Sequence, residues 1–132
     1  MKHSPQQPEV ILLGASEKPE RFAHQALVML RQNGYAVIPV HPRLSSIEDI
    51  PVIAALDQAP RNASSLTLYV NPARALAAAD TIIAIRPQRV IFNPGTESPR
   101  LQRILTNAGI DWLEDCTLEM LREGRFDSAP PA

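Results

Sequence analysis

Short apolar runs and longer amphipathic segments alternate along the chain. The apolar runs lack the polar alternation of a half-exposed strand, so they predict strands that are covered on both faces. Between them, apolar residues recur at helical spacing. The segment over residues 19–33 carries Phe22, Ala26, Met29 and Leu30 on one predicted stripe and stops before a glycine. The apolar runs cover residues 10–13, 35–40, 66–70, 89–92 and 110–113.

Capping signals place the ends of the other predicted helices. Asn71 before Pro72 is typical of an N-cap followed by proline at the first helical position. A later amphipathic segment closes at Gly109, since glycine commonly ends a helix. Shorter helices are expected over residues 54–58 and 117–122.

This alternation of strands and helices is the pattern of right-handed βαβ units around a parallel sheet. The predicted fold class is therefore α/β, a three-layer α/β/α sandwich with a Rossmann-like parallel sheet of about five strands. One domain is expected over residues 9–126, between flexible tails at residues 1–8 and 127–132. Pro39 predicts that the second strand is short or loses its ladder before His41, because proline has no N–H to donate.

Composition narrows the functional classes. The chain has 132 residues, of which 45% are hydrophobic and 20% charged, which suits one domain with a substantial core. A net charge of -1 argues against a dedicated nucleic-acid-binding protein. The single cysteine excludes an internal disulfide framework, and the three histidines lack metal-ligand spacing, so no metal site is expected. No signal peptide or membrane span is apparent, so a cytoplasmic protein without a membrane partner is expected.

In open parallel sheets, ligands bind beyond the carboxyl ends of the strands. Gly14, Ala15 and Ser16 follow the first predicted strand, where glycine allows close approach and a helix N-terminus offers N–H groups to an anion. The dinucleotide fingerprint would require glycine at positions 16 and 19, but the chain has Ser16 and Pro19. The turn therefore predicts phosphate contact without the standard NAD motif. The alternative is an ordinary tight turn with Ser16 as a cap.

The exit of the second strand carries His41 and Arg43, where an NAD enzyme usually has an acidic residue for the ribose hydroxyls. A cation suits a ribose phosphate better, such as the 2′-phosphate of NADP or the 3′-phosphate of coenzyme A. The alternative is that Arg43 is a solvated loop residue. Lys18 and Arg21 are further candidates for phosphate contact, although most such charged clusters are simply solvated.

Residues 10–42 read VILLGASEKPERFAHQALVMLRQNGYAVIPVHP, and they resemble the small bacterial CoA-binding proteins. The resemblance continues in LTLYVNP at 66–72, RVIFNPGTE at 89–97 and DCTL at 115–118, and covers nearly all of the chain between the tails. The same family resembles the N-terminal domain of the succinyl-CoA synthetase alpha subunit. The resemblance implies a Rossmann-like domain that binds coenzyme A at the strand ends.

Two departures from that family pattern affect the implied site. His41 stands where asparagine is common, and Asn71 stands where some members carry arginine, so phosphate binding could be weaker or the ligand different. By position, the turn at residues 14–16 would hold phosphate, and the other strand exits would flank the rest of coenzyme A. Together with the two charged residues named above, the expected contacts are Gly14, Ala15, Ser16, Lys18, Arg21, Val40, His41, Pro42, Arg43, Val70, Asn71, Pro72, Asn93, Pro94 and Gly95.

Three functional classes follow from these observations. The first is a non-catalytic protein that binds coenzyme A or acyl-CoA, with a homodimer left open. The second is a small NAD(P)-dependent oxidoreductase, although the chain leaves no room for a separate substrate domain. The third is a regulatory or partner domain with a degenerate pocket. Ser16, His41 and Asp115, or His41 with Cys116, lie at predicted strand ends, but no G-x-S-x-G elbow supports catalysis. We therefore expect no catalytic residue.

Overall fold

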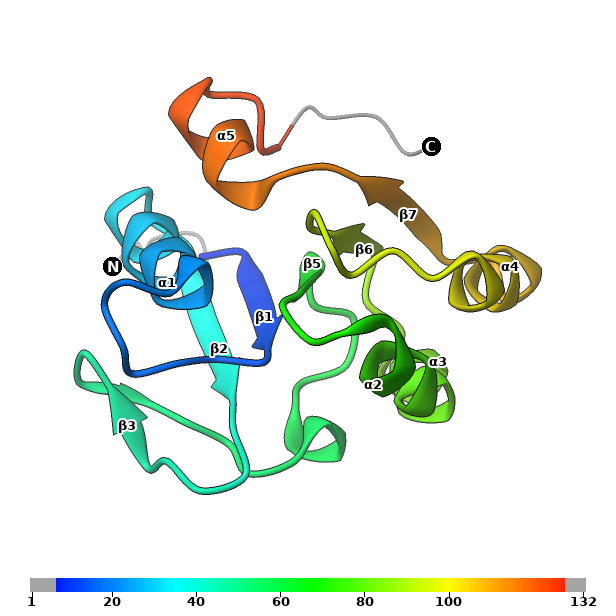
Figure 1. The fold of residues 1–132 in the computed structure, drawn as a ribbon, viewed down its shortest axis with the longest axis horizontal. Coiled ribbons are helices and arrows are strands. Elements are labelled where there is room, and N and C mark those ends of the chain that lie inside the picture. Colours follow the sequence, from blue (N-terminus) through cyan, green and yellow to red (C-terminus); the bar gives the residue numbers. More distant parts are fainter. Residues whose placement is uncertain (1–6, 128–132) are drawn as a thin grey trace, which may run out of the picture.

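The computed structural model describes residues 7–127 and contains a five-stranded parallel sheet (Figure 1). The strands lie in the order β2-β1-β5-β6-β7, and every neighbouring pair is parallel. Most of the two predicted tails, residues 1–6 and 128–132, lies outside the described residues. The strand bounds are Glu9–Leu13 for β1, Ala36–Val40 for β2, Ser65–Leu68 for β5, Arg89–Phe92 for β6 and Asp111–Glu114 for β7.

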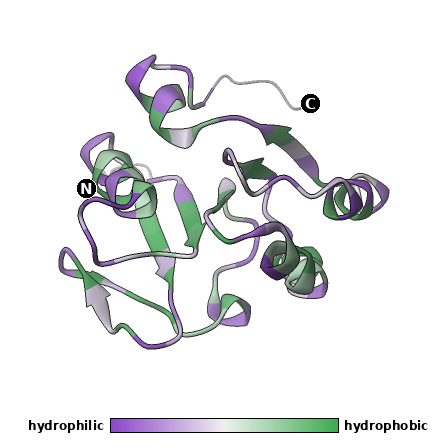
Figure 2. Cartoon of the chain, viewed as in Figure 1, coloured by the Kyte–Doolittle hydropathy of each residue, from purple (hydrophilic) through white to green (hydrophobic). Residues whose placement is uncertain are grey.

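Helices cover both faces of this sheet, so the predicted three-layer sandwich is confirmed. On one face, α1 (Phe22–Gln32) contacts α5 (Thr117–Arg122). On the other, α4 (Pro99–Asn107) contacts α2 (Pro72–Ala77) and α3 (Ala79–Ile85). Figure 2 shows hydrophobic colour on β1 and β2 and hydrophilic colour on the outer turns. This distribution is expected when helices bury both faces of a parallel sheet.

Each face of the sheet has its own apolar core, and β1 contributes to both. Ile11 joins the core beneath α2, α3 and α4, whereas Val10 and Leu12 join the core beneath α1 and α5. Phe92 of β6 belongs to the first core, where its ring meets that of Trp112 edge-on at 5.9 Å. Successive strand residues point to opposite faces, so a strand covered on both sides must be apolar throughout.

The first helix is shorter than its sequence pattern predicted. It begins at Phe22 rather than at residue 19, because the preceding residues form turns in which the Arg21 N–H donates to the Lys18 carbonyl at 3.0 Å. The predicted stripe was also wrong at its first position, because Phe22 is 69% exposed. Ala23 and Leu27 are buried beside Ala26 and Leu30, which shifts the apolar face around the helix.

The second strand lies at the edge of the sheet and ends at Val40, as Pro39 predicted. The Pro39 carbonyl accepts a hydrogen bond from the Ile53 N–H at 3.0 Å, and the Ile53 carbonyl accepts one from the His41 N–H at 3.0 Å. Within a strand, the N–H and C=O of one residue point to the same side. The donor that proline lacks would therefore face away from β1, and the β1–β2 ladder remains intact.

A small hairpin between β2 and β5 was missed by the sequence interpretation. It pairs β3 (Ser46–Ile47) with β4 (Ile50–Pro51) in antiparallel fashion. Its turn residues, Glu48 and Asp49, have φ values of 51° and 65°, a conformation that usually calls for glycine or asparagine. His24 Nε2 lies 3.0 Å from Glu48 Oε2 and ties the turn to α1. The helix expected over residues 54–58 is only a 3-10 turn, η1 (Leu56–Gln58).

The close approach of Gly14 to Tyr69 gives a stability prediction. Gly14 has φ +94°, and a Cβ atom there would lie 2.8 Å from the Tyr69 carbonyl oxygen and 2.9 Å from Val70 Cγ1. Gly14→Ala should therefore lower the free energy of unfolding by about 2–4 kcal/mol. Gly34 has φ +89° but no atom within 4 Å of such a Cβ, so Gly34→Ala should cost only about 1 kcal/mol. Urea unfolding measures both values, and equal losses would contradict tight packing at Gly14.

Candidate functional site

The chain adds its strands first on one side of β1 and then, from β5 onward, on the other side. After β1 the chain passes through α1 to β2 on one side, whereas β5, β6 and β7 lie on the other. At such a switch point the loops leave the strands in opposite directions and open a crevice beyond the carboxyl ends. A pocket of about 470 Å³ lies at this place.

Three strand exits and the segment before η1 form the walls of this pocket. The structure brings together eight of the predicted residues there: Gly14, Ala15, Val40, His41, Pro42, Arg43, Val70 and Asn71. Seven lining residues were missed: Leu13, Ala54, Ala55, Leu56, Tyr69, Arg74 and Ala78. Seven predicted residues do not line it: Ser16, Lys18, Arg21, Pro72, Asn93, Pro94 and Gly95.

The glycine turn after β1 is held against the end of β2. The Ala15 N–H donates to the Val40 carbonyl at 3.2 Å, so any N–H offered to a phosphate must come from another residue of the turn. Ser16 Oγ accepts from the Lys18 N–H at 3.1 Å, which makes it a local turn cap. Because α1 begins only at Phe22, the turn is separated from the helix N-terminus that was expected to assist it.

His41 stabilises the second strand exit by accepting hydrogen bonds from the following backbone. Its Nδ1 accepts from the N–H groups of Arg43 at 3.0 Å and Leu44 at 3.2 Å. An acceptor at Nδ1 leaves the proton of a neutral imidazole on Nε2. An asparagine oxygen makes the same kind of bond two residues downstream in an Asx turn. Histidine therefore preserves the turn that an asparagine at this position would form.

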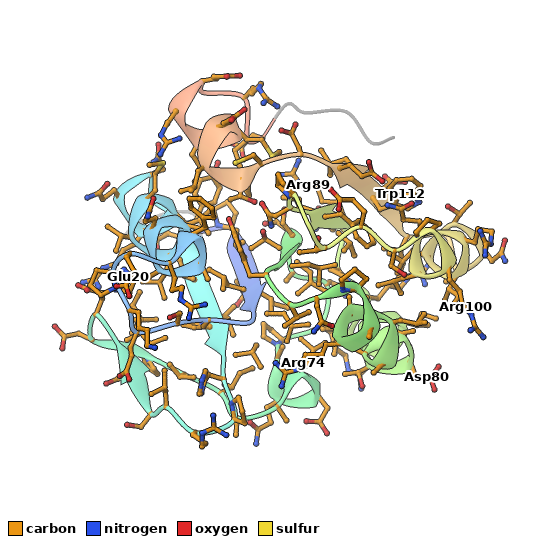
Figure 3. All side chains as sticks on the ribbon, in the orientation of Figure 1. Glu20, Arg74, Asp80, Arg89, Arg100 and Trp112 are labelled. Carbon is orange, nitrogen blue, oxygen red and sulfur yellow. The ribbon has the colours of Figure 1, made fainter. Side chains whose placement is uncertain are left out.

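Two arginines line the pocket from different elements. Arg43 follows β2, and Arg74 lies in the first turn of α2; both residues are exposed. Asn71 caps α2 as predicted, with its Oδ1 accepting from the Arg74 N–H at 2.9 Å. Figure 3 labels Arg74 at this helix. Position 71 lacks the arginine of the family pattern, but Arg74 supplies a cation three residues later. The capping signal could have indicated it, because a residue in the first helical turn lies close to the cap.

The three side chains considered for a Ser-His-Asp relay are each bonded to other groups. His41 and Ser16 accept from neighbouring backbone, as described above. Asp115 Oδ2 lies 2.6 Å from Arg125 Nη1, and its Oδ1 accepts from the Cys116 N–H at 2.7 Å. The Arg125 guanidinium is the main cause that holds the pKa of Asp115 below its ordinary value. The geometry therefore gives no Ser-His-Asp relay in the described part of the chain.

Asn93 links three elements beneath the strand ends. Its side chain donates to Thr67 Oγ1 at 2.7 Å and to the Leu68 carbonyl at 2.8 Å, and its Oδ1 accepts from the Thr117 N–H at 2.9 Å. Only 2% of Asn93 is exposed. These bonds use both amide hydrogens and join β5, β6 and α5. Asn93, which was predicted to contact the ligand, is therefore a buried residue that holds these elements together.

This network predicts a large effect of substitution at Asn93. Asn93→Ala removes the partner of a backbone donor and of a backbone acceptor and one of the two partners of the Thr67 hydroxyl, so the free energy of unfolding should fall by about 2–4 kcal/mol. Asn107→Ala, at an exposed position near the end of α4, is the matched control and should change it by less than about 0.5 kcal/mol. Chemical denaturation measures both. A loss confined to ligand affinity would contradict the architectural role.

A second pocket, of about 360 Å³, lies at the amino ends of the strands, opposite the first pocket. Arg89 in its wall donates to Ser65 Oγ at 2.7 Å and to the Phe126 carbonyl at 2.6 Å, and stacks 4.6 Å above the Phe126 ring. Figure 3 shows Arg89 well separated from Arg74. This edge carries the amino ends of the strands, whereas ligands of parallel sheets bind at the carboxyl ends. The pocket at the switch point is therefore the candidate site.

Two further observations concern residues 7–127 alone. In this range no cluster of three or more histidine, cysteine, aspartate or glutamate side chains is arranged to hold a metal ion. No helix in the same range has the length and apolar character needed to cross a membrane.

The parallel sheet and its switch-point pocket define a Rossmann-like binding domain. The chain belongs to the CoA-binding domain family, whose sequence profile matches residues 9–122. It is similar to an uncharacterized protein of known crystal structure, with 34% identity, a TM-score of 0.85 and coverage of 92% of this chain and 100% of that one. A Thermus thermophilus protein shares 28% identity, with a TM-score of 0.81 and 91% coverage of both chains.

A more distant likeness concerns the fold alone. The chain is 16% identical to the dinucleotide-forming acetyl-coenzyme A synthetase 1 of Ca. Korarchaeum cryptofilum, a structure in complex with phosphate and ADP. The TM-score is 0.70, and the match covers 80% of this chain but 25% of that enzyme. The present fold thus corresponds to about one quarter of that larger chain.

Proposed function

We propose that this protein binds coenzyme A or an acyl-CoA, without transforming it, through one domain over residues 9–126. The observation that carries the proposal is the approach of Arg43 and Arg74 to a single pocket beside the Gly14 turn. Coenzyme A presents a pyrophosphate and a 3′-phosphate, and guanidinium groups bind phosphates through paired, charge-assisted hydrogen bonds. Membership of the CoA-binding domain family supports the same ligand class.

The pocket also suits the uncharged parts of such a ligand. Its volume of about 470 Å³ is in the range of small-molecule sites. Leu13, Val40 and Val70 supply apolar walls to the same pocket. The side chains of Ser16, His41 and Asp115 are committed to turns and to an ion pair, which favours binding without chemistry. The arginine at position 74 argues against a degenerate pocket, because the site retains two cations despite Asn71.

Calorimetric titration tests this function. Coenzyme A should bind at least about tenfold more tightly than dephospho-CoA, because only coenzyme A carries the 3′-phosphate. NADPH, with its phosphate at the 2′ position, should bind more weakly, and acetyl-CoA should be recovered intact after incubation. Failure of coenzyme A to bind would refute the proposal. Equal affinity for dephospho-CoA would refute only the role of the 3′-phosphate.

Substitution of the two arginines should separate their roles. Arg43→Ala and Arg74→Ala should each weaken coenzyme A binding about tenfold, through loss of a charge-assisted hydrogen bond. The variant that removes the 3′-phosphate contact should bind coenzyme A and dephospho-CoA equally. Arg103→Ala, at an exposed position on α4 outside this pocket, is the control and should bind like the wild type. Unchanged binding by both pocket variants would contradict the assigned site.

A further inference from the structure

The two edges of the parallel sheet differ in what covers them. At β2, Ile53 bonds the Pro39 carbonyl and the His41 N–H at the end of the strand. At β7, which lies at the opposite edge in Figure 1, no further strand pairs with the outer side among residues 7–127. An open edge presents unpaired N–H and C=O groups to strands of other chains. The sheet can therefore be extended at β7.

The hydrogen bonds of β7 show which of its backbone groups point outward. The Asp115 N–H donates to the Phe92 carbonyl of β6 at 3.1 Å. Successive residues of a strand turn their backbone groups to opposite sides, so Leu113 faces β6 like Asp115. Trp112 and Glu114 then turn their N–H and C=O groups away from the sheet. The open edge thus offers two residues that flank Leu113 symmetrically.

A groove lies beside this edge. Its volume is about 370 Å³, and its lining consists of residues from α4 together with Trp112 of β7. Figure 3 labels Trp112, whose indole N–H donates to Thr106 Oγ1 at 2.9 Å. Arg103 supplies the one charge in the lining, and no acidic side chain is part of it. The groove is therefore suited to an anionic group.

The same strand carries such an anionic group. Glu114 is exposed, and its Oε2 accepts from Gln102 Nε2 of α4 at 2.8 Å, so it lies on the α4 face of the sheet, as Trp112 does. An acidic side chain at an edge discourages pairing with strands in general. A strand that does pair here has to bring a cation to Glu114 and an anion to the groove.

We propose that this edge joins two copies of the chain, through antiparallel pairing of β7 with the β7 of the partner. In an antiparallel pair, two opposed residues that face each other exchange both of their hydrogen bonds. With Leu113 on the two-fold axis, Trp112 meets the partner's Glu114, and Glu114 meets the partner's Trp112. All the outward backbone groups of both residues are then bonded, and the two sheets become one.

The charges of the chain fit this two-fold arrangement. The partner's Glu114 would lie beside the groove that Arg103 lines, and symmetry repeats the contact. On the other face, Asp111 would meet the partner's Asp115. Asp115 Oδ2 is 2.6 Å from Arg125 Nη1, so a guanidinium accompanies this pair of acids. A second copy therefore supplies both the cation and the anion that the edge requires.

Sedimentation analysis of the full chain tests the pairing. The wild type should form a reversible dimer at about 100 μM, because an interface of this size belongs to the weak class. Glu114→Pro should raise the dissociation constant of the dimer at least about tenfold, since it removes an outward N–H and leaves the bonds to β6 in place. Pro39 shows that the opposite edge strand accepts a proline of this kind.

Arg103→Glu tests the register without a change in the strand. Two-fold symmetry makes the substitution act twice, so it should weaken the dimer about tenfold. Addition of Glu114→Arg to the same chain should restore association, because opposite charges then face each other again. Arg100→Glu is the matched control, since Arg100 is an exposed residue of α4 outside the groove, and it should dimerise like the wild type.

The outcomes are independent of whether coenzyme A binds. A wild type that remains monomeric at about 100 μM would overturn the proposal. A dimer that Glu114→Pro and Arg103→Glu leave unchanged would also overturn it, because another surface would then hold the copies together. Equal weakening by Arg100→Glu and Arg103→Glu would assign the effect to net charge, with the same consequence. If Glu114→Pro does not fold, Arg103→Glu and its double variant decide, because Arg103 is exposed.

Discussion

The candidate site depends on the close packing of Gly14 against the backbone of Tyr69. This contact leaves no room for a side chain at Gly14, and it holds the exits of β1 and β5 side by side at the switch point. The Ala15–Val40 hydrogen bond then adds the exit of β2. Three loops that are distant in sequence are thereby held around one pocket. The positions of Arg43 and Arg74 are therefore determined by backbone contacts of these loops rather than by their own side chains.

A buried hydrogen-bond network joins the neighbouring strand ends. The buried amide of Asn93 and the hydroxyls of Thr67 and Thr117 satisfy one another in a network that crosses from β5 through β6 to α5. Hydrogen-bonded buried polar groups confer a defined geometry. The Tyr69 phenol adjoins this network at Thr117. The strand ends beside the pocket therefore have rigid support.

The apolar runs and helix caps were sufficient to predict the layers and the parallel sheet, and the strand exits together with the family resemblance predicted about half of the residues that line the pocket. Strand exits are predictable because a parallel sheet brings them to one edge. The β3–β4 hairpin was not predictable, since Glu48 and Asp49 give no sign of left-handed conformation. Arg74 was missed although the cap at Asn71 could have indicated it, and Tyr69 was missed because its contact with Gly14 is a tertiary property.

The segment after β2 also affects how the molecule meets other molecules. Through Ile53, it bonds the Pro39 carbonyl and the His41 N–H at the end of the edge strand, which would otherwise be open to strands of other chains. The same segment continues directly into Ala54, Ala55 and Leu56, which form a wall of the pocket. Insertions or deletions here would alter ligand selectivity and self-association together. Evolution of a new specificity at this wall is therefore constrained by the need to keep the sheet edge covered.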